Sequence, residues 1–301
     1  MTDTRAKARP ASRWVGLIGA ALTVAPGFAP AQPVDLFYER TVMSAADARC
    51  DLFAPAVSAA LAAAAAQARG ASLRAGTSAG ALRQVEDAAR AKAAAVGCAS
   101  PDIALAASRV RNAFAGFSKI STLIYPGDVA PWKADRGVGR AARWRLAQDV
   151  AFGPDRMAFG VAGSQGGNAL VAVARFQDGA TPYAARLLMR DQTRTAQPYL
   201  DRWSSGSTAG LPLTRRLPPQ SALRAYAATF RSPAGEDLLP KDVRHGWAFR
   251  FSDAAMADLA RLDPRESIVV EFLFPGDVSR RAYVEVGDFA AGSAFIQVAT
   301  R

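Results

Sequence analysis

The chain contains only two cysteines, Cys50 and Cys98, and they flank an alanine-rich stretch. Alanine is the strongest helix former, and the run 52–73 has no cluster of β-branched residues to oppose it. Gly76 suits the turn after a helix, and Ser78 suits the cap of the next one. The stretch therefore predicts two helices that fold back on each other as a hairpin.

The positions of the cysteines predict a disulfide across the open end of this hairpin. Ser44, with Asp47 in the turn that follows, is predicted to cap the first arm. Cys50 and Cys98 are equally distant from Arg74 along the chain. Because every helical residue rises by about 1.5 Å, two arms of equal length return both sulfurs to the same end. A disulfide closing a loop of this size contributes on the order of 4 kcal/mol.

A third helix is predicted to begin at Ser100, followed by proline and aspartate, and to bury Phe114 and Phe117. Residues 32–117 are therefore predicted to form a helical domain.

The N-terminal residues have the pattern of an export signal. Basic residues are followed by an apolar run from Trp14 to Ala25. This run is shorter than the roughly 20 residues that a membrane-spanning helix needs. Ala29-Pro30-Ala31 fits the small-residue cleavage pattern, so residues 1–31 are predicted to be a signal peptide cut before Gln32. We expect a periplasmic or secreted protein with no transmembrane segment after cleavage. Such a compartment favours the disulfide.

The composition changes after Phe117. Residues 118–139 are rich in glycine, proline and aspartate, and this pattern predicts a linker. From residue 140 onward apolar residues tend to alternate with polar ones, as they do in half-buried strands. Residues 140–301 are therefore predicted to form a mainly antiparallel β domain, a sandwich or a strongly curved sheet, with two short helices. The predicted fold class is α+β.

The chain has few residues that suit catalysis. His245 is the only histidine, so a zinc site built on histidines is not expected, and we expect no metal or other cofactor. A serine hydrolase would need Ser164, Asp242 and His245 to converge. The sequence around Ser164 lacks the first glycine of the G-x-S-x-G elbow, which disfavours that triad.

Two carboxylates on the predicted strands offer an alternative catalytic pair. Glu271 and Glu285 fall on the same face of a predicted hairpin, and glycoside hydrolysis uses two carboxyl groups about 5 to 9 Å apart. Arg281 lies on that face too, and a cross-strand Glu–Arg pair explains the pattern without chemistry.

Clustered arginines are candidates for anion binding. They are Arg186, Arg190, Arg194, Arg215 and Arg216. Such a set can hold phosphate or carboxylate groups, but a solvated sheet face is the preferred interpretation.

The function predicted from these features is that of an exported, non-catalytic binding or scaffolding protein. The formal net charge of +11 is nearly all arginine, as a GC-rich genome would produce, so it is discounted as functional evidence. It still implies some attraction to anionic surfaces such as envelope polysaccharide or lipid headgroups, and the partner can also be a protein. Basic and aromatic residues do not interleave as single-stranded nucleic acids require, so no nucleic acid is expected. The alternatives are a periplasmic hydrolase that acts on envelope material and a subunit of a secretion or surface assembly.

Overall fold

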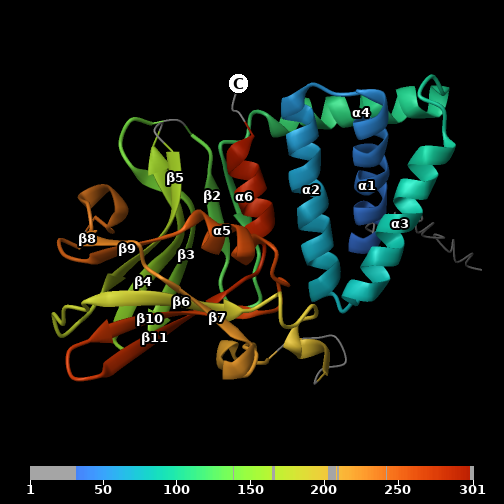
Figure 1. Ribbon diagram of the computed structural model, residues 1–301. Coiled ribbons are helices and arrows are strands. Elements are labelled where there is room, and N and C mark those ends of the chain that lie inside the picture. The colour runs from blue at the N-terminus through green and yellow to red at the C-terminus, as the bar shows by residue number, and fades with distance from the viewer. Residues whose placement is uncertain are drawn as a thin grey trace, which may run out of the picture. The chain divides into compact units, whose positions relative to one another are not determined.

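A computed structural model describes residues 32–298, except residues 138, 165–166, 203–207, 209 and 242 (Figure 1). Residues 32–301 belong to one compact unit. The predicted signal peptide and its cleavage site lie outside the described residues. In the described part of the chain, no helix is long and apolar enough to cross a bilayer.

Four helices open the described chain: α1 (Pro33–Cys50), α2 (Pro55–Arg74), α3 (Ala79–Ala95) and α4 (Pro101–Phe117). Helix α1 stands between α2 and α3 and packs against both (Figure 1). The Cys50–Cys98 disulfide is present, with the two Cα atoms 5.6 Å apart. It links the end of α1 to the segment after α3, so the predicted disulfide is confirmed.

The predicted hairpin needs one correction, because Cys50 ends a separate helix, α1, that precedes α2. Ser44 does not cap a helix: its hydroxyl donates to the Arg40 carbonyl within α1, which begins at Pro33. The disulfide therefore fastens α1 to α3, with α2 outside the linked pair. Gly76 does provide the turn between α2 and α3, with a φ of 97°, and Ser78 caps α3 by accepting from the Ala81 amide.

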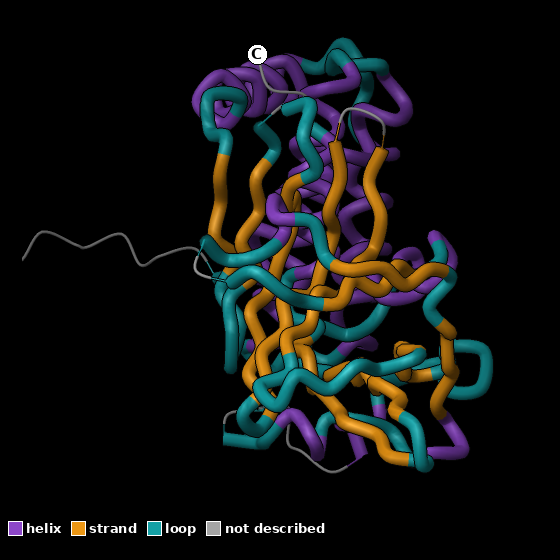
Figure 2. The backbone as a smooth tube through the Cα atoms, turned by 90° about the vertical axis from the view of Figure 1, so that its left-hand side faces the viewer, coloured by secondary structure: helices purple, strands orange, loops and turns teal. Residues whose placement is uncertain are grey.

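The larger of two antiparallel sheets has the strand order β1-β2-β3-β4-β5-β9-β8. Its strands are β1 (Thr122–Tyr125), β2 (Trp132–Asp135), β3 (Arg143–Phe152), β4 (Asp155–Ser164), β5 (Gly167–Arg175), β8 (Phe230–Pro233) and β9 (Trp247–Phe251). In Figure 2 the strands run side by side as orange tubes, with the helices behind them.

The segment 118–139, which the sequence predicts as a linker, carries β1 and β2. Turn-forming residues separate the two strands, but Tyr125 at the end of β1 and Trp132 at the start of β2 are only 1% and 0% exposed. Their burial against α6 (Phe289–Gln297) holds the short strands at the edge of the large sheet: the Trp132 and Phe289 ring centroids are 5.1 Å apart. Where the chain divides into domains stays a prediction.

The smaller sheet has the order β11-β10-β6-β7. Its strands are β6 (Ala184–Arg190), β7 (Leu223–Ala227), β10 (Ser267–Phe274) and β11 (Val278–Glu285). Both sheets contribute to one hydrophobic cluster, in which Phe152 of β3 stacks on Phe272 of β10 at 5.7 Å. A helical region followed by a mainly antiparallel β region with short helices is thus confirmed.

Short helices complete the fold. They are α5 (Asp253–Ala260) and α6, with the 3-10 turns Tyr199–Arg202, Leu213–Arg215, Gln220–Ala222 and Glu236–Leu238. Helix α6 packs on α2, and Arg74 of α2 donates two hydrogen bonds to Asp288 at 2.6 and 2.8 Å.

Candidate binding site on the small sheet

The small sheet buries one face against the large sheet and carries charged and apolar rows on the other. The buried face includes Ile268, Val270 and Phe272. On the opposite face the strand register aligns side chains in rows across the four strands. The first row is Arg281, Glu271, Arg186 and Ala227, and the second is Tyr283, Val269, Leu188 and Ala225.

The charged row centres on one buried carboxylate. The Glu271 side chain is 1% exposed, and each of its two oxygens accepts a hydrogen bond, one from Arg186 Nε and one, at 2.7 Å, from Arg281 Nε. The arginine side chains remain 45% and 51% exposed. Each arginine uses Nε toward Glu271, and about half of each side chain stays exposed. We call these three residues the arginine clamp.

The electrostatics of the clamp favour its ionised form. Burial raises the pKa of Glu271, but the hydrogen bonds from Arg186 and Arg281 outweigh it, so the pKa lies below its usual value. The hydrogen bond to Glu271 in turn raises the pKa of Arg281, and Tyr283 adds to that rise. Two guanidinium charges face one carboxylate charge, so the clamp keeps one excess positive charge.

A small hollow of about 300 Å³ lies beside the clamp. Its floor is the second row, and Leu217, Gln220 and Leu223 line its walls together with the two arginines. A larger hollow of about 840 Å³ also includes Arg281 and Tyr283 and extends to Phe152, Leu213 and Arg280. These two shared residues of β11 therefore border both hollows.

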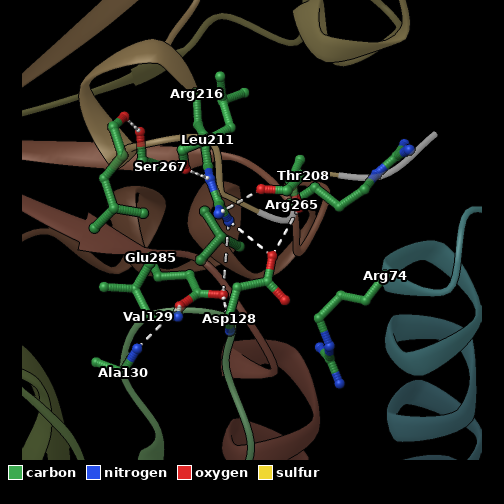
Figure 3. Close-up of polar contacts among 12 residues, drawn as sticks. Arg74, Asp128, Val129, Ala130, Thr208, Leu211, Arg216, Arg265, Ser267 and Glu285 are labelled. Atoms are coloured by element: carbon green, nitrogen blue, oxygen red, sulfur yellow. Dashed lines mark hydrogen bonds and ion pairs between the residues drawn. The ribbon is translucent and has the colours of Figure 1, made fainter. Parts of the chain in front are cut away.

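A buried polar network holds the loop that forms the walls (Figure 3). Arg216 is 2% exposed and donates to Asp128 at 2.9 Å, to the Leu211 carbonyl at 2.9 Å and to the Thr208 carbonyl at 3.0 Å. The Ser267 hydroxyl donates to the Leu213 carbonyl at 2.6 Å. These contacts fix the loop against β10, and the fixed loop positions Leu217 beside the clamp.

The two carboxylates considered as an alternative catalytic pair, Glu271 and Glu285, do not lie together. Glu285 is fully buried and accepts the backbone N–H groups of Asp128, Val129 and Ala130 at 2.7, 2.8 and 3.2 Å. In the register Glu271 faces Arg281, whereas Glu285 faces Ser267, four residues along the strand. At about 3.3 Å per residue the two carboxylates lie roughly 13 Å apart along the strand, beyond the separation of a glycosidase pair. The Glu–Arg interpretation is the one that the contacts support.

The candidate serine hydrolase triad, which the sequence disfavours, is not supported by the positions of Ser164 and His245. Ser164 lies at the end of β4, opposite Gly167 at the start of β5. His245 is exposed in the segment before β9, and β9 begins beside Ala174 near the other end of β5. Asp242 lies outside the described residues.

The predicted anion-binding arginines divide into buried and exposed groups. Arg190 donates to both Glu266 oxygens, at 2.5 and 3.0 Å, and Arg216 belongs to the network above, so both are engaged internally. Arg194 pairs with Asp191, and Arg215 is exposed in a 3-10 turn. Of the five, Arg186 alone belongs to the clamp. Sequence reasoning missed Arg281 and Tyr283 as site residues, although strand alternation places them on the face of Glu271.

In the described part of the chain, no group of three or more histidine, cysteine or carboxylate ligands gathers. The chain matches no protein-family model, no curated protein and no solved structure.

Proposed function

We propose that this protein is exported and binds an anionic component of the cell envelope at the arginine clamp, without catalysing a reaction. The observation that carries the proposal is that two half-exposed guanidinium groups are held in place by one buried glutamate. An arginine keeps its charge at any physiological pH, and its planar group suits carboxylate and phosphate oxygens. Because Glu271 already orients both arginines, a ligand does not have to order them.

Other features support export and weaken the alternatives. The N-terminal pattern and the disulfide both fit an oxidising compartment. A hydrolase lacks support because Ser164 and His245 lie near opposite ends of β5. The alanine-rich α2, whose small side chains suggested an assembly subunit, already packs against α1 and α6.

The proposal is tested by measuring how the purified protein binds polygalacturonate and phosphatidylglycerol vesicles. Dextran and phosphatidylcholine vesicles are the neutral controls. We expect binding to the anionic probes alone, weakened at least tenfold by the double change Arg186→Gln and Arg281→Gln. Hydrogen bonds to charged groups contribute about 1.5–3 kcal/mol each, which corresponds to such a loss.

A matched control separates the clamp from general charge attraction. Arg194→Gln with Arg215→Gln removes the same charge from two other arginines, which are exposed outside the clamp. This variant should bind like the unmodified protein. Equal losses in the two double variants would contradict a site at the clamp.

A further inference from the structure

We infer that the arginine clamp and the small hollow together bind an amphiphilic anion, in which one carboxylate or phosphate head carries an aliphatic body of medium length. The inference deepens the proposed function, since it assigns a ligand class to the same site. The observation that supports it is the second row of the sheet face, which is mostly apolar and lies next to the charged row.

The head and body positions follow from the strand register. The charged and apolar rows are two residues apart on each strand, which corresponds to about 7 Å. A head held by the guanidinium groups of Arg186 and Arg281 therefore places the next few carbon atoms of the ligand over the second row, where Leu188 is half-buried and Val269 is buried. Leu217, on the loop held by Arg216, covers that position from the side.

The wall chemistry favours an aliphatic body over a sugar. Apart from the two arginines, the residues that line the small hollow offer polar side-chain groups at Gln220 and Tyr283 only. A sugar ring presents hydroxyl groups on all sides, and burying a hydroxyl without a hydrogen-bond partner costs free energy. Methylene groups gain free energy in the same place, because they displace water from the half-buried side chains of Leu188, Leu217 and Leu223.

The size of the hollow limits the ligand to one short chain. A volume of about 300 Å³ is at the low end of ligand sites in proteins. It holds one short acyl chain, and it does not hold both chains of a membrane phospholipid. The ligand is therefore bound singly, and the vesicle surface is not needed for this step.

Calorimetry with a series of carboxylates tests the inference on the intact purified protein. The probes are butanoate, hexanoate and octanoate, with galacturonate as a sugar carboxylate, octyl glucoside as a neutral amphiphile and octyl phosphate as the second head, each below its micelle concentration. From butanoate to octanoate, affinity should rise about fourfold per methylene group, the factor expected for burial of one CH₂. Octanoate should bind more tightly than galacturonate, and octyl glucoside should bind at least tenfold more weakly. Comparing octanoate with octyl phosphate identifies the preferred head.

Two variants test whether the ligand binds at the clamp and in the small hollow. Arg186→Gln with Arg281→Gln should weaken octanoate binding at least tenfold, and so should Leu217→Gln, which puts an amide into the hollow. Leu105→Gln is the matched control, because Leu105 is 56% exposed on α4 and outside the site. Circular dichroism melting confirms that each variant is folded.

The outcomes separate the ligand class from the proposed function. Three results would each overturn the inference that the ligand is an amphiphilic anion. They are equal affinity along the carboxylate series, tighter binding of galacturonate than of octanoate, and no effect of Leu217→Gln. Polygalacturonate binding that still depends on Arg186 and Arg281 would leave the proposed function standing in that case. If neither octanoate nor polygalacturonate nor the anionic vesicles bind, both ideas fail.

Discussion

Glu271 decides whether the two clamp arginines stay in position, because it contacts both of them from a buried site. Without its charge, Arg186 and Arg281 would repel each other and lose the acceptor that fixes them. The Glu271 pKa is below its ordinary value, because the hydrogen bonds from the two arginines outweigh the effect of burial. The ionised carboxylate therefore stabilises the fold fully above the unfolded pKa, and this contribution is lost as the pH falls through the lower folded pKa.

We predict that Glu271→Gln lowers the free energy of unfolding at pH 7 by about 1–3 kcal/mol. The difference from the unmodified protein should shrink as the pH falls through the lowered folded pKa of Glu271 and the carboxylate becomes protonated. Urea denaturation at pH 7 and at acidic pH measures both effects. Glu86→Gln is the control, since Glu86 pairs with Arg90 at a helix surface and such pairs contribute a few tenths of a kcal/mol. If the stability difference between Glu271→Gln and the unmodified protein grew toward low pH, the stabilising role of the ionised Glu271 carboxylate would be contradicted.

At the residue scale, the sequence predicts local contacts and misses distant ones. The facing of Glu271 and Arg281 follows from alternation around one tight turn, and the Ser78 cap follows from its neighbours. Arg190 and Arg216 could not be assigned in this way. Their partners are Glu266 and Asp128, which are 76 and 88 residues away, and nothing in a one-dimensional pattern distinguishes a buried arginine from an exposed one.

At the element scale, the elements that the sequence misses are those whose stability comes from packing. The first ten residues of α1 include five β-branched or aromatic residues of modest helix propensity, so local signals favour a start near Ser44. Its burial is what makes it a helix: Phe37 and Met43 belong to two separate hydrophobic clusters. The four-residue strands β1 and β2 were hidden in the same way by the turn residues around them.

The packing of α2 on α6 depends on a glycine. A Cβ atom at Gly70 would lie 2.5 Å from Asp288 Oδ1, the atom that accepts from Arg74. Gly70→Ala should gain helix propensity of about 1 kcal/mol, yet the overpacking costs about 1–3 kcal/mol and separates the ion pair. We therefore predict a net loss of stability, measured by urea denaturation.

Gly116→Ala tests the same substitution without the clash. Gly116 lies in α4, and no atom stands within 4 Å of the position that its Cβ would take. This variant should be as stable as the unmodified protein or more stable, by up to about 1 kcal/mol. If both alanine variants were stabilised, Asp288 would move aside easily and the close packing at Gly70 would not matter.

At the scale of the whole molecule, the helical region has less hydrophobic support than the β region. The β region shares one large cluster across both sheets, whereas the helices depend on three smaller clusters. Helix α1 takes part in all three, and the disulfide fastens its last residue to the segment after α3. A covalent link at that point compensates for the divided helical core.

We predict that reduction of the disulfide, or Cys50→Ser with Cys98→Ser, lowers the free energy of unfolding by about 4 kcal/mol, the value expected for a sequence separation of 48 residues. Urea denaturation with and without dithiothreitol measures the loss. The double serine variant is its own control, because dithiothreitol should not change its stability. In hydrogen exchange the amides of α1 and α3 should lose protection before those of β10 and β11. Unchanged stability after verified reduction would mean that packing alone holds α1, and the disulfide would then have no structural role.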